Sequence, residues 1–77
     1  MTRLPIVSSK TMDRLLRKLG FASVRQKGSH VFYRHPDGRT TTLPSHPGRD
    51  LARPLLREVL REIELSVEQF NTELENL

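Results

Sequence analysis

The segment from Phe21 to Pro44, FASVRQKGSHVFYRHPDGRTTTLP, contains three short runs typical of β-strands, separated by two turns. The runs are Phe21–Gln26, His30–Arg34 and Arg39–Leu43. The last run is rich in β-branched Thr, which favours strands. Lys27-Gly28-Ser29 separates the first two runs, and a Pro-Asp-Gly turn separates the second pair. Spacers this short predict an antiparallel three-stranded sheet.

A helical pattern precedes the three strand-like runs. Its apolar residues are spaced three or four positions apart and form one stripe, which consists of Met12, Leu15, Leu16 and Leu19. We predict a helix over Lys10–Leu19. Ser8 or Ser9 is suited to be its N-cap, and Gly20 is suited to end it.

Two further helices are predicted after the strands. The first begins near Pro54, because proline is well tolerated at the first helical position. Its buried stripe consists of Leu55, Leu56, Val59, Leu60 and Ile63. Ser66 and Gln69 form a capping-box pattern, which predicts a short third helix from Val67 towards Glu75. The residues expected to pack one face of this helix are Val67, Phe70 and Leu74.

The predicted order of elements is α-β-β-β-α followed by a short C-terminal helix, an α+β fold with helices on one face of the sheet. A chain of 77 residues is too short to divide, so residues 1–77 are expected to form a single domain. It contains no Cys, which excludes a disulfide framework or a thiolate metal site. Its longest apolar runs are too short for a membrane span or a secretory signal, so a cytoplasmic protein is expected.

Charge is distributed unevenly along the chain. Residues 1–61 hold all thirteen Lys and Arg against four Asp and Glu, a net charge of +9. Residues 62–77 hold five Glu and no basic residue, a net charge of −5. A domain body this basic favours polyanions such as nucleic acid, or an acidic protein surface. The acidic end is expected to point away from any nucleic-acid site.

Basic residues also form stripes on two of the predicted helices. The first stripe is Lys10, Arg14, Arg17 and Lys18, and the second is Arg53, Arg57 and Arg61. Like charges four positions apart destabilise a helix by roughly 0.2–0.5 kcal/mol per pair, a cost that Asp13 and Glu58 offset in part by pairing with Arg17 and Arg61. Each stripe alone is typical of a solvated surface. Together with Lys27, Arg34 and Arg39 in the strand region, they also fit a surface that contacts phosphates.

His30 stands out among the three histidines because of its setting. It follows Gly28 and Ser29 and opens a predicted strand, a rigid element that can hold a catalytic side chain in place. Strict alternation puts it on the same face as Phe32, which we expect in the core. The Gly-Ser turn therefore rotates His30 outward, or His30 lies at the margin of the sheet. The turn that contains His35 accounts for this residue without any chemistry. His46 lies in a loop with two prolines, and it either lines a site or is an incidental surface residue.

The sequence lacks the common patterns for metal or nucleophilic catalysis. The histidines are far apart, and no HxH, HExxH, paired carboxylates or Gly-rich phosphate loop is present, so no metal and no cofactor are expected. Acid–base chemistry on a bound polyanion remains. RNA suits it, because the ribose 2′-hydroxyl can attack the adjacent phosphate, an imidazole can accept its proton, and cations can stabilise the developing charge.

Several spaced motifs of the chain, in order, resemble the HicA toxin family, small RNA-cleaving toxins of bacterial and archaeal toxin–antitoxin pairs. They are Leu19-Gly20-Phe21, Arg25-Gln26-Lys27-Gly28-Ser29-His30, Arg34-His35-Pro36-Asp37-Gly38, Leu43-Pro44-Ser45-His46-Pro47-Gly48 and the helices within residues 55–70. The likeness covers about residues 9–70, the expected core of the domain. Residues 71–77 form an acidic tail beyond it, with no role that the sequence assigns.

The resemblance implies a fold similar to the double-stranded RNA-binding domain and a ribosome-independent mRNA endoribonuclease that needs no metal. It implies that His30 is the single essential histidine. It also implies a HicB-like antitoxin that buries the active site, with DNA contacted only indirectly, through the antitoxin. The candidate RNA-binding residues are Arg14, Arg25, Lys27, Gly28, Ser29, Arg34 and Arg57. The acid that protonates the leaving oxygen is left open among Tyr33, His35, His46 and solvent.

Two other interpretations fit the same sequence. The first is a non-catalytic RNA-binding module, which recognises 2′-hydroxyls and phosphates without needing a histidine. The second is a protein-interaction domain whose basic face meets an acidic partner. RNA cleavage in the presence of a chelator separates the enzyme from both, and RNA retention separates the first alternative from the second.

Overall fold

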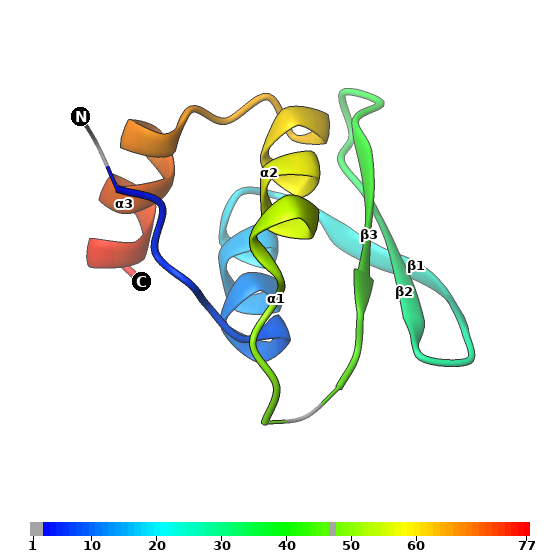
Figure 1. Cartoon of the computed structure of the whole chain (residues 1–77). Helices are drawn as coiled ribbons and strands as arrows, with labels where there is room; N and C mark the ends of the chain where they lie inside the picture. Colours follow the sequence, from blue (N-terminus) through cyan, green and yellow to red (C-terminus); the bar gives the residue numbers. More distant parts are fainter. Residues whose placement is uncertain (1–2, 47) are drawn as a thin grey trace.

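The computed structural model describes residues 3–46 and 48–77, and its element order is the predicted one (Figure 1). The elements are α1 (Ser9–Lys18), β1 (Ala22–Lys27), β2 (His30–Arg34), β3 (Thr40–Pro44), α2 (Arg53–Glu62) and α3 (Val67–Glu75). Each predicted strand and helix forms within a residue of its expected limits. The α+β class and the three-stranded antiparallel sheet are confirmed.

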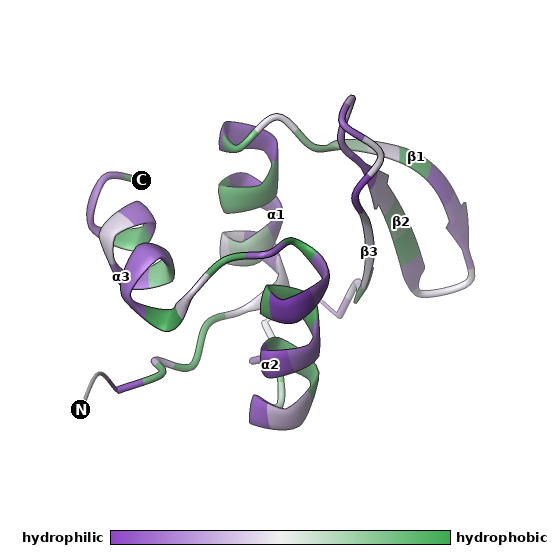
Figure 2. Ribbon diagram, turned by 90° about the horizontal axis from the view of Figure 1, so that it is seen from above, coloured by the Kyte–Doolittle hydropathy of each residue, from purple (hydrophilic) through white to green (hydrophobic). Residues whose placement is uncertain are grey.

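The elements form three layers (Figures 1 and 2). The strands lie in the order β1-β2-β3, with both pairs antiparallel. Helices α1 and α2 cover one face of this sheet, and α3 packs on the far side of the two helices. In the described part of the chain nothing covers the other face of the sheet, which we call the open face.

The core lies between the sheet and the helices and continues to α3. Its fully buried side chains come from α1, β3, α2 and α3 together with the short connection after α2, and they are Met12, Leu15, Leu16, Leu43, Leu56, Val59, Ile63 and Phe70. Most of these residues belong to the stripes predicted from the sequence, because apolar residues at helical spacing share one face. No helix in the described ranges is long and apolar enough to cross a membrane.

The prediction that Phe32 belongs to the core is wrong. The side chains of β2 that face the helices are Val31 and Tyr33, and Tyr33 is only 3% exposed. Phe32 lies on the open face and is partly exposed. The alternation of side chains along the strand holds, but the covered face is the one that carries the tyrosine, whose hydroxyl finds a partner there.

The helix α3 is an integral layer of the domain. Phe70 is fully buried, and the residues around it that pack against the core are Val67, Leu74 and Leu77. Its capping box is present, with Ser66 Oγ accepting from the Gln69 backbone at 3.1 Å. Lys18 on α1 pairs with Glu73 at 2.9 Å. These contacts hold the acidic end of the chain on the side of the molecule opposite to the sheet.

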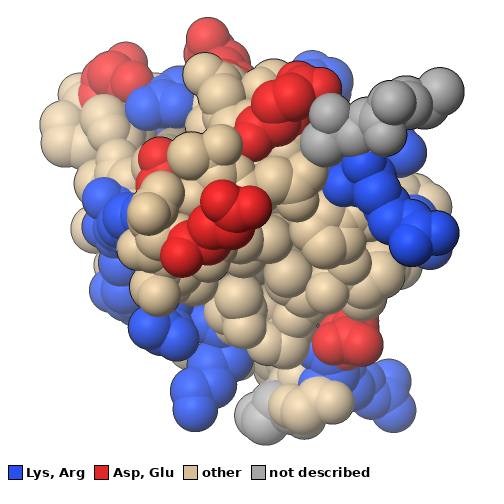
Figure 3. All heavy atoms as spheres, turned by 90° about the vertical axis from the view of Figure 1, so that its left-hand side faces the viewer, with Lys and Arg blue, Asp and Glu red and all other residues tan. Residues whose placement is uncertain are grey.

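Figure 3 shows the face of the molecule that α3 forms, where several acidic side chains gather and the basic ones lie mainly towards the margins. The open face of the sheet lies on the other side. The arrangement separates the two charge regions seen in the sequence. The acidic end of the chain therefore points away from the sheet.

Both α1 and α2 end in the same hydrogen-bond pattern, but with different residues at the left-handed position. After α1, Gly20 has φ +101° and the Phe21 N–H donates to the Leu16 carbonyl at 2.9 Å. After α2, Glu64 has φ +59° and the Leu65 N–H donates to the Leu60 carbonyl at 2.9 Å. Both are Schellman ends, for which glycine is the usual residue because it has no Cβ.

Replacing Glu64 by glycine is therefore expected to stabilise the protein. The left-handed backbone costs a residue with a Cβ roughly 1–2 kcal/mol, and the greater freedom of glycine in the unfolded chain removes part of that gain. We expect Glu64→Gly to raise the free energy of unfolding by about 0.5–1 kcal/mol, seen as an increase in melting temperature of roughly 2–6 °C.

The reverse change at the matched position is the control. A Cβ at Gly20 would lie 2.9 Å from His35 Nε2, and the backbone there has a positive φ. Gly20→Ala should therefore lower the free energy of unfolding by at least about 1–2 kcal/mol. A stabilised Gly20→Ala or a destabilised Glu64→Gly in thermal denaturation would contradict this account of the two helix ends.

Candidate functional site

His30 lies at one end of the sheet and its side chain is exposed. It is the first residue of β2, and its cross-strand neighbours are Lys27 on β1 and Pro44 on β3. Side chains alternate along a strand, so His30 lies on the same face as Phe32 and Arg34. His30 is therefore both at the margin of the sheet and on its open face, outside the hydrophobic core.

The turn before His30 is a two-residue hairpin loop made by Gly28 and Ser29. Gly28 has φ +58°, and a positive φ at the first loop position is the arrangement of a type II′ turn, where glycine is favoured. Gln26 Nε2 donates to the Gly28 carbonyl at 3.0 Å, and the Ser45 N–H donates to the Ser29 carbonyl. These bonds fix the backbone that carries His30.

Three basic side chains lie on the open face together with His30. Lys27 is opposite His30, and Arg25 and Arg34 lie further along the sheet on the same face. The three strands contain no Asp or Glu, and among the described residues none of the ion pairs involves these three cations. The open face therefore carries a positive potential that no neighbouring carboxylate neutralises.

Arg14 and Arg57 are exposed but lie elsewhere, on the helices α1 and α2 that cover the opposite face of the sheet. The structure thus divides the seven candidate RNA-binding residues. It places Arg25, Lys27, Gly28, Ser29 and Arg34 around His30 or along its face. The two helical arginines belong to the layer of helices behind the sheet.

Tyr33 is not beside His30, because it points to the helix side of the sheet. Its hydroxyl donates to Asp13 Oδ1 at 2.5 Å, and Asp13 in turn accepts from Arg17 Nε at 3.1 Å. Burial of the ring raises the pKa of Tyr33 well above its ordinary value, and the hydrogen bond and charge of Asp13 add to the effect. This group ties β2 to α1.

Tyr33 is the only tyrosine of the chain, and the chain has no tryptophan, so the absorbance of the phenolate reports this residue alone. We expect its titration to be shifted to higher pH in the folded protein and to return to about pH 10 in denaturant. Above pH 10 the unfolded state loses this proton while the folded state keeps it, so stability should fall as pH rises. Tyr33→Phe should remove that part of the slope. A midpoint equal in both states would contradict the buried hydrogen bond.

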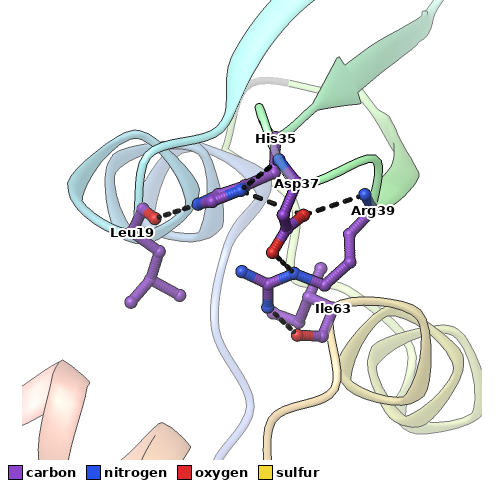
Figure 4. A network of polar contacts seen from close by, with 5 residues as sticks. All are labelled: Leu19, His35, Asp37, Arg39 and Ile63. Carbon is purple, nitrogen blue, oxygen red and sulfur yellow. Dashed lines mark hydrogen bonds and ion pairs between the residues drawn. The ribbon is translucent and has the colours of Figure 1, made fainter.

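His35 has a structural role (Figure 4). Its Nε2 lies 3.1 Å from the Leu19 carbonyl at the end of α1, and its Nδ1 accepts from the Asp37 N–H at 3.1 Å. Arg39 extends the network, because its Nε pairs with Asp37 Oδ2 at 2.7 Å and its Nη1 donates to the Ile63 carbonyl. The backbone N–H and the guanidinium of Arg39 lower the pKa of Asp37. The β2–β3 turn thus caps the C-terminal ends of α1 and α2.

His46 is exposed in the loop that follows β3. The loop starts at Ser45, directly after Pro44, the cross-strand neighbour of His30. His46, Arg49 and Asp50 line a shallow hollow of about 280 Å³ beside the start of α1. Pro47, the second proline of this loop, lies outside the described residues. Of the other histidines, His46 is the one on the loop next to the His30 end of the sheet.

Two features of the site were not predicted from the sequence. The Arg25 guanidinium lies over the Phe32 ring, 4.6 Å from its centroid, on the open face. A hollow of about 440 Å³ surrounds this pair and continues to Thr42 and Arg34. The spacing of His30 and Phe32 is the available signal, but the expectation that Phe32 lies in the core hides it. Across residues 3–46 and 48–77, no group of three His, Asp or Glu side chains is placed to hold a metal ion.

Comparison with known proteins identifies the family. A family model described as the HicA toxin of bacterial toxin–antitoxin systems matches residues 9–65, well over half of the chain. The match runs from α1 to the turn after α2 and includes the strands and His30, but not α3. No curated protein sequence matches the chain. The length of the family match, over elements that fold as that resemblance implied, shows that the chain belongs to the HicA toxin family.

Proposed function

We propose that the protein is an endoribonuclease, the toxin of a toxin–antitoxin pair, in which His30 is the general base. The observation that supports this most is the exposure of His30 on the open face of the sheet, next to Lys27 and on strands that contain no Asp or Glu. An exposed imidazole at a cationic surface can reach a phosphate backbone. Tyr33, the other candidate on β2, is buried and cannot contact RNA.

In the proposed reaction His30 takes the proton of a ribose 2′-hydroxyl. The freed oxygen attacks the adjacent phosphorus, and the bond to the 5′-oxygen of the next nucleotide breaks. The products are a 2′,3′-cyclic phosphate and a strand with a free 5′-hydroxyl. Lys27 and Arg25 stabilise the negative charge on the phosphoryl oxygens. The proton for the leaving oxygen comes from solvent or from His46, on the loop that follows β3.

The competing function is a non-catalytic RNA-binding module. It is favoured by the likeness of the fold to domains that bind RNA duplexes by shape, and it needs the cations but not His30. The two functions differ in one result. Purified protein incubated with RNA and excess chelator should shorten the RNA if it is the proposed enzyme, and should retain the RNA intact if it is only a binder.

Salt dependence tests the participation of the cations. If Arg25, Lys27 and Arg34 each neutralise one phosphate of a single strand, the logarithm of the affinity should fall with the logarithm of salt concentration with a slope of about −2. Replacing Lys27 by Gln should reduce that slope by about 0.7, whereas Arg57→Gln should leave it unchanged because Arg57 lies on the other side of the sheet. Equal effects of the two changes would contradict the assignment of the open face.

We propose that the partner is a HicB-like antitoxin with an acidic surface. The basis is the membership of a toxin–antitoxin family together with the cationic surfaces on the sheet and on α2. Complementary charge acts chiefly on the association rate. Reversing the charge of Arg57 and Arg61 should therefore slow antitoxin association at low salt. Association rates that are unchanged by both substitutions would remove α2 from the interface.

A further inference from the structure

The open face carries an aromatic side chain for which the proposed chemistry gives no use. Phe32 is in the middle of β2, the central strand, and is partly exposed. Its cross-strand neighbours are Arg25 and Thr42. An apolar ring in this position would be covered in an ordinary core. Here the Arg25 guanidinium lies over it, 4.6 Å from the ring centroid, and Arg25 is itself exposed.

The surroundings of Phe32 suit a planar, polar ligand. The hollow of about 440 Å³ around it is lined by Val24, Arg25, Phe32, Arg34, Thr40 and Thr42, among other residues. Aromatic rings and guanidinium planes both stack on nucleobases, and threonine hydroxyls can donate to or accept from base edges. The absence of Asp and Glu from the three strands fits a ligand that carries phosphate.

The distance between Phe32 and His30 fits one nucleotide of the proposed RNA substrate. Residues two apart on one face of a strand are about 6.6 Å apart, since each residue advances the strand by about 3.3 Å. A nucleotide whose base stacks on Phe32 would therefore have its sugar and phosphate within reach of His30 and Lys27. In a duplex both faces of each base are occupied by neighbouring bases, so only an unpaired base can stack in this way.

We propose that Phe32 and Arg25 form a subsite for one unpaired nucleobase of the RNA, next to the scissile phosphate. This rests on the proposed endoribonuclease function and adds to it a residue that determines specificity. The subsite makes the protein selective for single-stranded RNA, although its fold resembles a domain that binds duplexes. Phe32 positions the nucleotide and takes no part in the proton transfers.

The test measures RNA binding in a His30→Ala background, so that the RNA stays intact. The probes are a fluorescently labelled single strand of mixed sequence and the same strand annealed to its complement. Phe32→Ala and Phe32→Leu should each raise the dissociation constant for the single strand by about 10–100-fold, because stacking on an aromatic side chain is lost. Phe32→Leu keeps the apolar bulk, so it separates stacking from stability. Both changes should affect duplex binding much less.

Phe32→Trp provides a positive control and a second signal. It keeps a stacking surface, and the tryptophan would be the only one in the chain. Its fluorescence should be quenched by the single strand, with affinity at least equal to that of the Phe32 parent. The matched negative control is Ile6→Ala, which removes an exposed apolar side chain outside the sheet. It should bind single-stranded RNA with the affinity of the parent.

The outcomes separate this subsite from the general proposal. If protein with His30 intact cleaves RNA but Phe32→Leu does not weaken single-strand binding, the subsite is wrong and the endoribonuclease stands. Equal weakening on single strand and duplex also overturns the subsite. So does a loss of antitoxin binding with RNA affinity unchanged, because the face would then be a protein interface. Protein that neither binds nor cleaves RNA overturns both proposals together.

Discussion

Replacing His30 by alanine should lower the rate of RNA cleavage by about 10²–10⁴-fold while changing RNA affinity little. The reason is that a general base contributes to the transition state, whereas the phosphate contacts come from the cations. His30 is exposed and no described side chain hydrogen-bonds to it, so the change should not disturb the fold. Single-turnover cleavage with saturating protein gives the rate, and binding of a 2′-O-methyl strand gives the affinity.

His30→Gln tests whether the loss of cleavage comes from the missing proton acceptor. It keeps a polar side chain of similar length but cannot exchange a proton near neutral pH, so it should be about as inactive as the alanine variant. Both variants should melt at the temperature of the parent. If either one cleaves RNA at the parental rate, His30 is not the base, and a different residue of the cationic face must be sought.

Of the substitutions considered, Phe70→Ala should lower the free energy of unfolding most. Phe70 is fully buried and joins α3 to the rest of the core. Deleting a buried phenyl group costs about 3–5 kcal/mol, through lost burial and through the cavity that remains. A small domain has only about 5–15 kcal/mol of stability in total, so the variant should be substantially unfolded at moderate denaturant concentrations.

Phe70→Leu is the matched control, since leucine fills part of the same space and should lower the unfolding midpoint much less. The comparison decides whether α3 belongs to the folding unit, because the family match ends before it. If Phe70→Ala unfolds at the denaturant concentration of the parent, α3 is an appendage and residues 9–65 alone make the domain.

Much of the fold could be predicted because the local signals agree with one another. The capping box at Ser66 and Gln69, the proline at the start of α2 and the glycine after α1 each act over a few residues. The ion pairs of Asp13 with Arg17 and of Glu58 with Arg61 were predicted from spacing alone and are confirmed. Such effects are encoded within one turn of chain, so they can be read without tertiary structure.

The error at Phe32 has a different cause. A period of two tells which residues of a strand share a face, but not which face the helices cover. The expectation for Phe32 rests on its own apolar character, although its face also carries His30 and Arg34. The helices cover the other face, where the tyrosine hydroxyl donates to the carboxylate of Asp13, twenty residues away on α1. The register break near Val24 on β1 could not be foreseen for the same reason. Contacts between distant elements decide these features.

The candidate site was predicted in part. The structure places Arg25, Lys27, Arg34 and the Gly-Ser turn with His30, as their proximity in sequence suggested. It separates Arg14 and Arg57, because the helices lie behind the sheet. His35 and Arg39 cap two helices through the carbonyls of Leu19 and Ile63. No sequence pattern predicts contacts between such distant partners.

Comparing a ribonucleotide strand with its 2′-O-methyl counterpart in excess chelator tests the central claim most directly. If an exposed imidazole draws a proton from the sugar, the natural strand should be cut to a cyclic phosphate end and the methylated strand should remain whole. Scission of both strands, or of neither until a divalent cation is restored, would show that the chemistry does not proceed through that hydroxyl and that base.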